Sequence, residues 1–464
     1  MKRRGSKTAG CLAVACWAGL LVSCATLPDY GPQVQDRGAR AVRLASAHGR
    51  LSAAQSAAIL ARLDREGKSG DLLARHIAIE QSVAGGPMVI GNKVELLEDG
   101  PATYRSMFAA MREAKSNIDF ETYIFRDDEV GHQFAELMLS KQAQGVQVNL
   151  IYDSVGSLKT PREFFERLKS AGVRVLEFNP ANPLWARRGW ALNHRDHRKL
   201  LVVDGRVAFV GGINVADTYA SGSSLGGRTT EEQKESGWRD MHARIEGPVA
   251  GEFQKLFLET WEKQNGEPVL GQGYFPEPRK AGDALVRAVG SAADDPHSLI
   301  YETLLAAVAN AQKTVHVTVA YFIPDRQIVE VLREAASRGV DVTLILPGAT
   351  DSWTVFHAGR SHYTELLEAG VKIYERGGAL LHSKAVVVDG VWSSIGSTNW
   401  DPRSFIHNDE INAVVLGGDF AGAMEKAFHK DIRQSKPIEL AQWRRRSPLL
   451  RLEELSARAW EYWL

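Results

Sequence analysis

Two short arrays of basic, acidic and amide residues are the part of this sequence best suited to chemistry. Both contain His, Lys, Asp and Asn at the same intervals, and in both the Asn follows the His by 17 positions. The first array is His197, Lys199, Asp204 and Asn214, and the second is His382, Lys384, Asp389 and Asn399. One such array could arise by chance, whereas two in register indicate a duplicated functional site.

The spacing within each array predicts where its side chains point. In a β-strand alternate side chains lie on one face, so the pattern His-x-Lys places the imidazole and the ammonium group together. Apolar residues follow at 200–203 and 385–388 and would anchor each strand in a core. Asp and Gly come next and favour a turn into a second strand, which ends shortly before the Asn. Two such hairpins side by side would present two imidazoles, two ammonium groups and two amides to one pocket.

That set of groups suits phosphoryl transfer without a metal. Ammonium and amide groups can hold the non-bridging oxygens of a phosphate and stabilise the charge that develops in the transition state. One imidazole can attack phosphorus, while the other protonates the leaving oxygen and then activates the acceptor. The remaining histidines show no spacing typical of a metal-binding motif. The sequence therefore predicts neither a metal nor another cofactor.

The segments that must position the two arrays also repeat. Before the first array, helices are predicted at 104–115 and 131–144 and strands at 118–125 and 146–152. Before the second array, helices are predicted at 299–312 and 327–337 and strands at 314–322 and 340–346. Strands that alternate with helices in this way indicate an α/β fold with a largely parallel or mixed sheet. The sequence thus predicts two similar halves that pack around a pseudo-twofold axis and share one site.

The two arrays resemble the paired HKD motifs of the phospholipase D superfamily, and the second half in particular is similar to bacterial cardiolipin synthases. That half carries YFIPD at 321–325, RGVDVTLILPG at 338–348 and GSTNWDPRSFIHNDE at 396–410. The first half carries GGIN at 211–214 and WRD at 238–240. The resemblance covers roughly residues 93–430. It implies two pseudo-symmetric α/β/α repeats around one shared active site, with helical extensions at both ends.

The resemblance also implies roles for the residues of the arrays. His197 would be the nucleophile that forms a phosphohistidine, and His382 would be the general acid and base, although the sequence does not decide this polarity. The phosphoryl oxygens would be bound by Lys199, Lys384, Asn214 and Asn399.

In the superfamily each histidine is oriented by a carboxylate further along the chain, often from the opposite half. Asp240 and Glu410 occupy those places here. Asp204 and Asp389 belong to the motifs but are expected to be structural, holding the turn and the neighbouring backbone.

The activity implied is transphosphatidylation, in which a phosphatidyltransferase makes cardiolipin from phosphatidylglycerol. A hydrolytic phospholipase D that releases phosphatidic acid is the alternative, because it differs only in whether water reaches the intermediate. A nuclease of the same superfamily typically has one array per chain, and the two arrays count against it. A non-catalytic lipoprotein scaffold is also disfavoured, since it would be expected to have lost His or Lys from one array.

The N-terminus is typical of a bacterial lipoprotein signal peptide. Positive charges at 2–7 precede an apolar run at 9–22 and the motif LVSC at 21–24, which predicts cleavage before Cys24 and acylation of its thiol. Removing residues 1–23 would take four of the 56 basic residues and leave 52 against 56 acidic ones, a net charge of −4 that disfavours nucleic-acid binding. Ala25 after the cysteine favours the outer membrane, so the predicted location is the periplasmic side of the cell envelope. An ordinary signal anchor is the alternative.

The predicted organisation follows from these signals. It comprises a signal peptide at 1–23, a tether and helical segment at 24–85, repeat 1 at 86–270, repeat 2 at 271–430 and an amphipathic C-terminal helix at 431–464. Leu449, Leu452, Leu455, Ala459 and Trp463 would share one face of that helix and either enter the headgroup region of a bilayer or pack on the core. The expected partners are phospholipids and a membrane surface, while the oligomeric state is left open.

Four further signals are ambiguous. His194 either lines the site or packs elsewhere, and Asp153 either contacts substrate or caps a turn. The segment 182–190 holds two Trp and two Arg and is either a headgroup-binding loop or a solvated one. GSSLG at 222–226 fits a nucleophile-elbow pattern, but it lacks the flanking strand and helix and is expected to be a loop.

Overall fold

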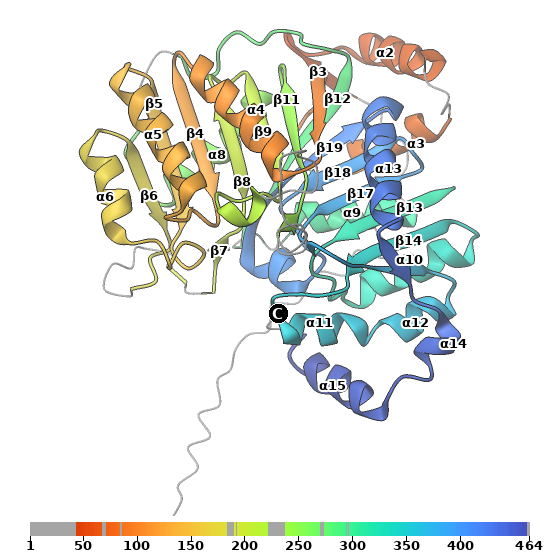
Figure 1. Ribbon diagram of the computed structural model, residues 1–464. Coiled ribbons are helices and arrows are strands. Elements are labelled where there is room, and N and C mark those ends of the chain that lie inside the picture. The colour runs from red at the N-terminus through yellow and green to blue at the C-terminus, as the bar shows by residue number, and fades with distance from the viewer. Residues whose placement is uncertain are drawn as a thin grey trace, which may run out of the picture.

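The protein has two α/β halves whose strands join in one continuous sheet. The computed structural model describes residues 43–461, apart from 67–70, 84–85, 183–189, 192, 221–236, 270–272, 294 and 296. In Figure 1 repeat 1 lies on the left in orange to light green and repeat 2 lies on the right in green to blue. The described residues of both repeats contribute to an 18-stranded sheet. The predicted α/β fold class is confirmed.

Repeat 1 is a mixed sheet with the strand order β6-β5-β4-β8-β9-β11-β3. Its strands are β3 (Met88–Leu97), β4 (Asn117–Thr122), β5 (Gln147–Asp153), β6 (Arg174–Phe178), β7 (Arg195–Asp196), β8 (Lys199–Val203), β9 (Val207–Gly211), β10 (Trp238–Arg239) and β11 (His242–Glu246). Its helices are α4 (Gly100–Glu113), α5 (Glu129–Ala143), α6 (Arg162–Ser170) and α8 (Ala250–Lys263), with a 3-10 turn at Asp217–Tyr219. Strands β4, β5 and β6 are parallel, and β8, which follows the first array's histidine, is antiparallel to β4.

Repeat 2 has the same topology with the order β15-β14-β13-β17-β18-β19-β12. Its strands are β12 (Ala284–Ser291), β13 (Thr314–Val319), β14 (Asp341–Pro347), β15 (Lys372–Arg376), β16 (Leu380–Leu381), β17 (Lys384–Val388), β18 (Trp392–Gly396) and β19 (Asn408–Leu416). Its helices are α9 (Leu299–Ala309), α10 (Arg326–Ser337), α11 (Trp353–Arg360), α12 (Tyr363–Glu368) and α13 (Gly418–Ile432), with a short π-helix at Arg403–His407. Strands β13 and β14 are parallel and β17 is antiparallel to β13, as in repeat 1.

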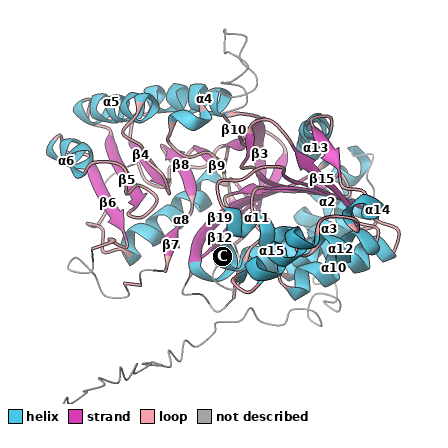
Figure 2. Ribbon diagram, turned by 60° about the horizontal axis from the view of Figure 1, so that its bottom comes forward, coloured by secondary structure: helices cyan, strands magenta, loops and turns pink. Residues whose placement is uncertain are grey.

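The motif strands are buried on both faces, which makes them a rigid frame. Leu200 and Val202 of β8 pack in the same core cluster as Ala385 and Val387 of β17, so this core lies between the repeats. The alternate residues of each strand face the outer cores, which are covered by helices. Figure 2 shows α4 and α5 along one face of the repeat 1 sheet and α8 along the other. Burying each such aliphatic side chain stabilises the fold by about 1.5–3 kcal/mol.

The N-terminal segment contains α2 (Ala53–Glu66) and α3 (Asp71–Ser82), preceded by a hairpin of β1 (Leu44–Ser46) and β2 (Gly49–Arg50). Helix α3 docks on repeat 2 through buried polar contacts. His76 Nε2 lies 3.0 Å from Asp389 Oδ2, and both side chains are inaccessible to solvent. Glu80 accepts hydrogen bonds from Arg287 at 2.9 Å and from the Trp392 indole at 2.7 Å. The segment therefore supports the turn that follows the second array's strand.

Replacing His76 with Ala is expected to lower the free energy of unfolding by about 1–3 kcal/mol, because a buried carboxylate loses a partner and a small cavity is left. The measurement is chemical denaturation of the variant beside the parent protein. His48→Ala is the control, since His48 is exposed. Equal unfolding midpoints for the two variants would show that the contact with Asp389 contributes nothing.

The C-terminal segment is not the single helix expected at 431–464. It contains β20 (Ser435–Pro437), which pairs with β15, then α14 (Leu440–Trp443) and α15 (Pro448–Arg458). Two prolines explain the break, because proline has no N–H to donate inside a helix. Pro448 instead opens α15, where Ser447 caps the first turn. Trp463 lies outside the described residues. Among the helices of the described ranges, none combines the length and the apolar composition of a transmembrane span.

Candidate active site

The two array histidines are held by strands of the opposite repeat. Strand β7, which leads into His197, pairs with β19 of repeat 2, and His197 N donates to Asp409 O at 2.9 Å. Strand β16, which leads into His382, pairs with β10 of repeat 1, and His382 N donates to Arg239 O at 2.8 Å. Because the strand before each histidine pairs with a strand of the other repeat, both histidines lie where the repeats meet.

Each imidazole is also bound by a buried carboxylate from the other repeat. His197 Nδ1 lies 2.9 Å from Glu410 Oε1, and His382 Nδ1 lies 2.7 Å from Asp240 Oδ2. Glu410 and Asp240 have no exposed surface. A carboxylate that accepts from Nδ1 fixes the proton there and leaves the lone pair of Nε2 free for a reacting group. The two carboxylates thus lie where the resemblance places them, each on the repeat opposite to its histidine.

The two lysines share the face of their histidines. Lys199 Nζ donates to the carbonyl of His197, and Lys384 Nζ donates to the carbonyl of His382. Both side chains are buried, and Lys199 Nζ also lies 5.2 Å from the ring centre of Tyr123. An ammonium group has three hydrogens, so each lysine keeps donors for an anionic ligand.

The two asparagines differ in their partners. Asn214 Oδ1 accepts from the backbone of Ile124 at 3.0 Å, and its Nδ2 donates to the Tyr219 hydroxyl at 3.0 Å. Asn399 is also buried, and its Oδ1 has no hydrogen-bond partner among the described residues. Only a group that donates a hydrogen bond, such as a hydroxyl, would satisfy this buried oxygen of Asn399.

Tyr219 is a site residue that the sequence analysis missed. Its hydroxyl lies 3.3 Å from His382 Nδ1 as well as contacting Asn214, so it links the two arrays. At the corresponding sequence position, five residues after the asparagine, the second array has Ser404 and not a tyrosine. Because the arrays were found by their repetition, a residue present on one side only gave no signal.

Another asymmetry lies beside the orienting carboxylates. Ser397 donates from its hydroxyl to Glu410, whereas repeat 1 has Gly212 at the equivalent place. A Cβ at Gly212 would lie 2.4 Å from the nearest oxygen of Asp240, so only glycine fits there. The two imidazole–carboxylate pairs are therefore alike in geometry but not in their further hydrogen bonding.

Burial lowers the pKa values of both histidines and both lysines of the site, and neighbouring lysine charges add to this effect at His197, His382 and Lys199. Burial, followed by the charge of Lys384, lowers the pKa of His382 to about 4, and burial followed by Lys199 keeps the pKa of His197 well below its usual value. Burial lowers the pKa of Lys199 to about 7 and that of Lys384 to about 8. Both imidazoles are therefore neutral at pH 7 in the empty site, which suits a nucleophile. An anion in the pocket would offset the lysine charges and favour protonation of an imidazole that acts as an acid.

The motif aspartates do not reach the site. Asp204 and Asp389 lie in the turns after β8 and β17, both with positive φ, at 52° and 55°. The Asp204 carboxylate accepts from the backbone of Lys115, Ser116 and Asn117. Asp389 accepts in the same way from residues 312–314. This geometry supports the structural role expected for both.

The other sequence candidates lie outside the reacting groups. Asp153 accepts from the backbone of Val155 at 2.8 Å and of Gly156 at 2.9 Å, so it caps the turn after β5. His194 accepts at its carbonyl from Asn179 at 3.0 Å. Of the segment 182–190, only Asn182 and Trp190 are described, while Cys24 and 222–226 lie outside the described residues.

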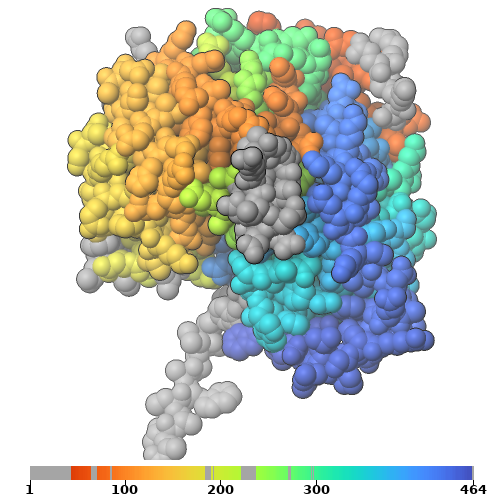
Figure 3. All heavy atoms as spheres, viewed as in Figure 1, coloured from red at the N-terminus to blue at the C-terminus, as the bar shows by residue number. Residues whose placement is uncertain are grey.

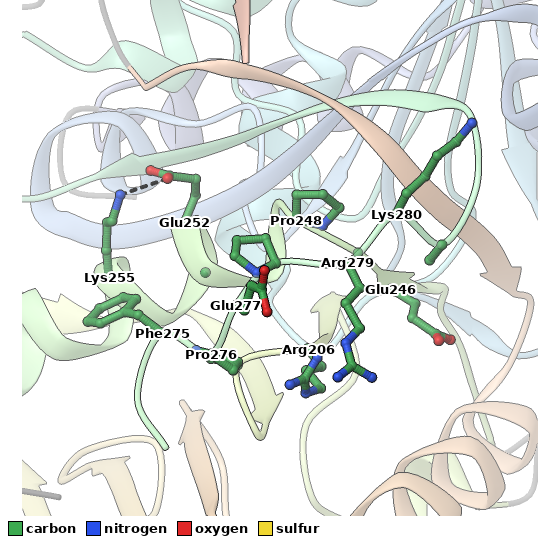
Figure 4. A pocket seen from close by; sticks show the side chains of 15 residues that line it. Arg206, Glu246, Pro248, Glu252, Lys255, Phe275, Pro276, Glu277, Arg279 and Lys280 are labelled. Atoms are coloured by element: carbon green, nitrogen blue, oxygen red, sulfur yellow. Dashed lines mark hydrogen bonds and ion pairs between the residues drawn. The ribbon is translucent and has the colours of Figure 1, made fainter. Parts of the chain in front are cut away.

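A cavity of about 510 Å³ lies at the opposite end of β8 from Lys199 (Figure 4). Arg206, Phe275 and Arg279 line it, together with the start of α8. None of the array residues borders this cavity, so it is separate from the proposed reaction centre.

Comparison with known protein families matches residues 107–261 and 304–432 to a family described as "Cardiolipin synthase, PLD-like domain". The two matched blocks contain the two arrays. Two similar proteins are a cardiolipin synthase of Geobacillus kaustophilus (strain HTA426), with 36% identity over 80% of this chain and 72% of the relative, and one of Halalkalibacterium halodurans, with 34% identity over 86% and 76%.

Among solved structures, the phosphatidylserine synthase of Haemophilus influenzae Rd KW20 is similar in fold. It superposes with a TM-score of 0.56 at 14% sequence identity and covers 79% of this chain and 92% of its own. This similarity extends the two-repeat arrangement to most of the described residues.

Proposed function

This chain belongs to the cardiolipin synthase family of the phospholipase D superfamily, and from that premise we propose that it makes cardiolipin from phosphatidylglycerol by transphosphatidylation. The observation that carries the proposal is the exchange of carboxylates between repeats, with Glu410 on His197 and Asp240 on His382. It supplies two oriented imidazoles at one junction, beside two buried ammonium groups. Phosphatidyl transfer can use one imidazole as the nucleophile, the other as the acid and base, and the ammonium groups to bind the phosphoryl oxygens.

In the first step His197 Nε2 attacks the phosphorus of phosphatidylglycerol, and the bond from phosphorus to the headgroup oxygen breaks. His382 protonates that oxygen, so glycerol leaves and phosphatidyl-His197 remains. The bound phosphodiester carries a negative charge, which raises the pKa of His382 from its low value in the empty site and lets it act as an acid. Lys199 and Lys384 stabilise the charge on the non-bridging oxygens.

In the second step the hydroxyl of another phosphatidylglycerol attacks the intermediate. His382 accepts the hydroxyl proton, the bond from phosphorus to His197 breaks, and cardiolipin is released. Two molecules of phosphatidylglycerol thus give one cardiolipin and one glycerol, and both histidines return to their starting state.

The direct test is incubation of purified protein with phosphatidylglycerol vesicles, followed by product analysis. Cardiolipin and glycerol in equal amounts are expected, with and without a chelator. Phosphatidic acid as the only lipid product would replace the proposal with the hydrolytic phospholipase D. Loss of turnover with chelator would contradict the metal-free mechanism.

The pH dependence of kcat/KM follows from the groups of the empty site. Above pH 8 the rate constant is expected to fall by about tenfold or more per pH unit, because Lys199 and Lys384, with pKa values of about 7 and 8, lose the charges that attract the phosphodiester. Below pH 7 it should also fall, since burial raises the pKa of Glu410 to about 7 and the protonated acid has lost the negative charge that holds the proton of His197 on Nδ1. A profile measured with a soluble short-chain substrate that stays flat from pH 6 to 9 would contradict these assignments.

We also propose that the protein is held on the periplasmic side of the outer membrane by acylation of Cys24. The support is the sequence motif at 21–24 alone. Labelling of cells with a tagged fatty acid should mark the parent protein and not Cys24→Ala, and density-gradient fractionation should place the parent with the outer membrane. Label on the variant, or none on the parent, would refute the anchor.

A further inference from the structure

Large apolar side chains are exposed at the edge of the sheet that carries the catalytic histidines. In repeat 1, the loop after β5 exposes Leu158 by 71% and Val155 by 37%. In repeat 2, the segment after β14 exposes Trp353 by 54%. Strands β5 and β14 end at the same edge at which β8 and β17 begin, because β4 and β13 are parallel to the former and antiparallel to the latter. These side chains therefore flank the proposed active site.

Helix α15 adds an unpartnered apolar stripe to this edge. One of its faces packs on α11, where Ala457 is buried with Ala358 and Ile323. Its other face exposes three leucines by more than 60% each, namely Leu449, Leu452 and Leu455. Figure 1 shows α11 and α15 at the lower side of the molecule, on the same side as β7, and Figure 2 turns this side toward the viewer. Packing on the core, one of the two arrangements expected for this helix, is met by the face with Ala457, while the leucine face stays free for the other.

Positive charge accompanies these apolar residues. Lys159 next to Leu158, and Arg445 and Arg451 around α15, are exposed, and none of them pairs with a carboxylate in the described part of the chain. In Figure 3 the lower surface of the molecule is formed by yellow residues of repeat 1 and by cyan and dark blue residues of repeat 2. Apolar side chains accompanied by exposed cations that have no carboxylate partner match the surface of a bilayer with negatively charged lipids.

We propose that this edge docks on an anionic phospholipid bilayer and turns the active site toward the lipid. The docking edge consists of Val155, Leu158, Trp353, Leu449, Leu452 and Leu455. The inference rests on the proposed function, because a phospholipid substrate must pass from the bilayer to the histidines. Leucines would enter the headgroup region, while the long lysine and arginine side chains reach lipid phosphates.

The opposite edge of the molecule provides a matched control. Phe275 is exposed by 48% and lies on the rim of the cavity at the far end of β8 (Figure 4). It is a large apolar side chain comparable to those of the docking edge, yet the proposed orientation keeps it away from lipid.

Hydrogen exchange of the full chain, with and without phosphatidylglycerol vesicles, tests the orientation even if an anchor holds the protein to the membrane. Vesicles are expected to slow exchange in the segments 154–161 and 448–458 and to leave 275–281 unchanged. Unchanged exchange in the first two segments, or protection only at 275–281, would overturn the proposal. Slower exchange of 154–161 and 448–458 on addition of a soluble partner protein, with no effect of vesicles, would also overturn the proposal.

A leucine variant separates docking from chemistry. Leu449→Gln/Leu452→Gln/Leu455→Gln keeps good helix-forming residues but removes the apolar stripe. Its turnover of phosphatidylglycerol in vesicles is expected to fall by about tenfold or more, while turnover of monomeric dihexanoyl phosphatidylglycerol stays at the parent level. Phe275→Gln should change neither.

Two results would contradict the proposed role of the docking edge. One is parent-level turnover of phosphatidylglycerol in vesicles by the triple variant, and the other is an equal loss of turnover on the vesicle and the monomeric substrate. If the parent protein turned over neither substrate, the proposed function would fail, and the exchange experiment would still decide the orientation.

Discussion

His197→Ala is expected to lose at least about 10⁴-fold in turnover of phosphatidylglycerol, and His382→Ala about as much. Without His197 no nucleophile faces the phosphorus, and the nearest array imidazole is already bound by Asp240. Without His382 neither the leaving oxygen nor the acceptor hydroxyl has a proton partner. Because the two act as a unit, the double variant should lose little more than either single one.

The measurement is kcat/KM with monomeric short-chain phosphatidylglycerol, which keeps membrane docking out of the comparison. His429→Ala is the control, since that histidine is 60% exposed on α13. More than about a hundredth of the parent activity in either active-site variant would show that its imidazole is dispensable.

Glu410→Gln and Asp240→Asn are each expected to lower kcat by about 10²–10⁴-fold with little change in KM. The amide keeps the size of the carboxylate but can donate to Nδ1, which moves the imidazole proton to Nε2 and blocks attack. It also removes the negative charge that stabilises a protonated His382. Substrate binding should be retained because both lysines remain.

The protein contains a matched control for this prediction. His316 and Glu425 form a similar pair, with Nδ1 2.8 Å from a carboxylate oxygen, but they lie away from the arrays on β13 and α13. Glu425→Gln should leave kcat unchanged. If Glu410→Gln and Asp240→Asn cost no more activity than Glu425→Gln, the exchanged carboxylates would have only a structural role.

The repeating part of the protein could be predicted from its sequence. The strand expected at 118–125 is β4, Asn117–Thr122, and the helix expected at 327–337 is α10, Arg326–Ser337. Periodicity and two arrays in register were sufficient for this, because each half supports the interpretation of the other. The orienting carboxylates needed the family resemblance, since nothing in their local sequence links Asp240 to His382.

The features that break the symmetry could not be predicted. Tyr219 has no counterpart in the second half, and Ser397 replaces Gly212 beside a carboxylate. His76 and Asp389 are 313 positions apart, and among the described residues of repeat 1 the equivalent Asp204 accepts from backbone only. The prediction of one helix at 431–464 was wrong for a local reason, because Pro448 opens a new helix inside that range.

On the proposed mechanism His197 carries the phosphatidyl group, while His382 gives and takes the proton. The most direct test uses His382→Asn with a phosphatidyl ester of p-nitrophenol, whose leaving group needs no acid, so that the first step proceeds and the second stalls. We expect a burst of about one nitrophenolate per chain and a phosphatidyl adduct on the peptide that contains His197. Steady release without an adduct, or an adduct on any other residue, would contradict it.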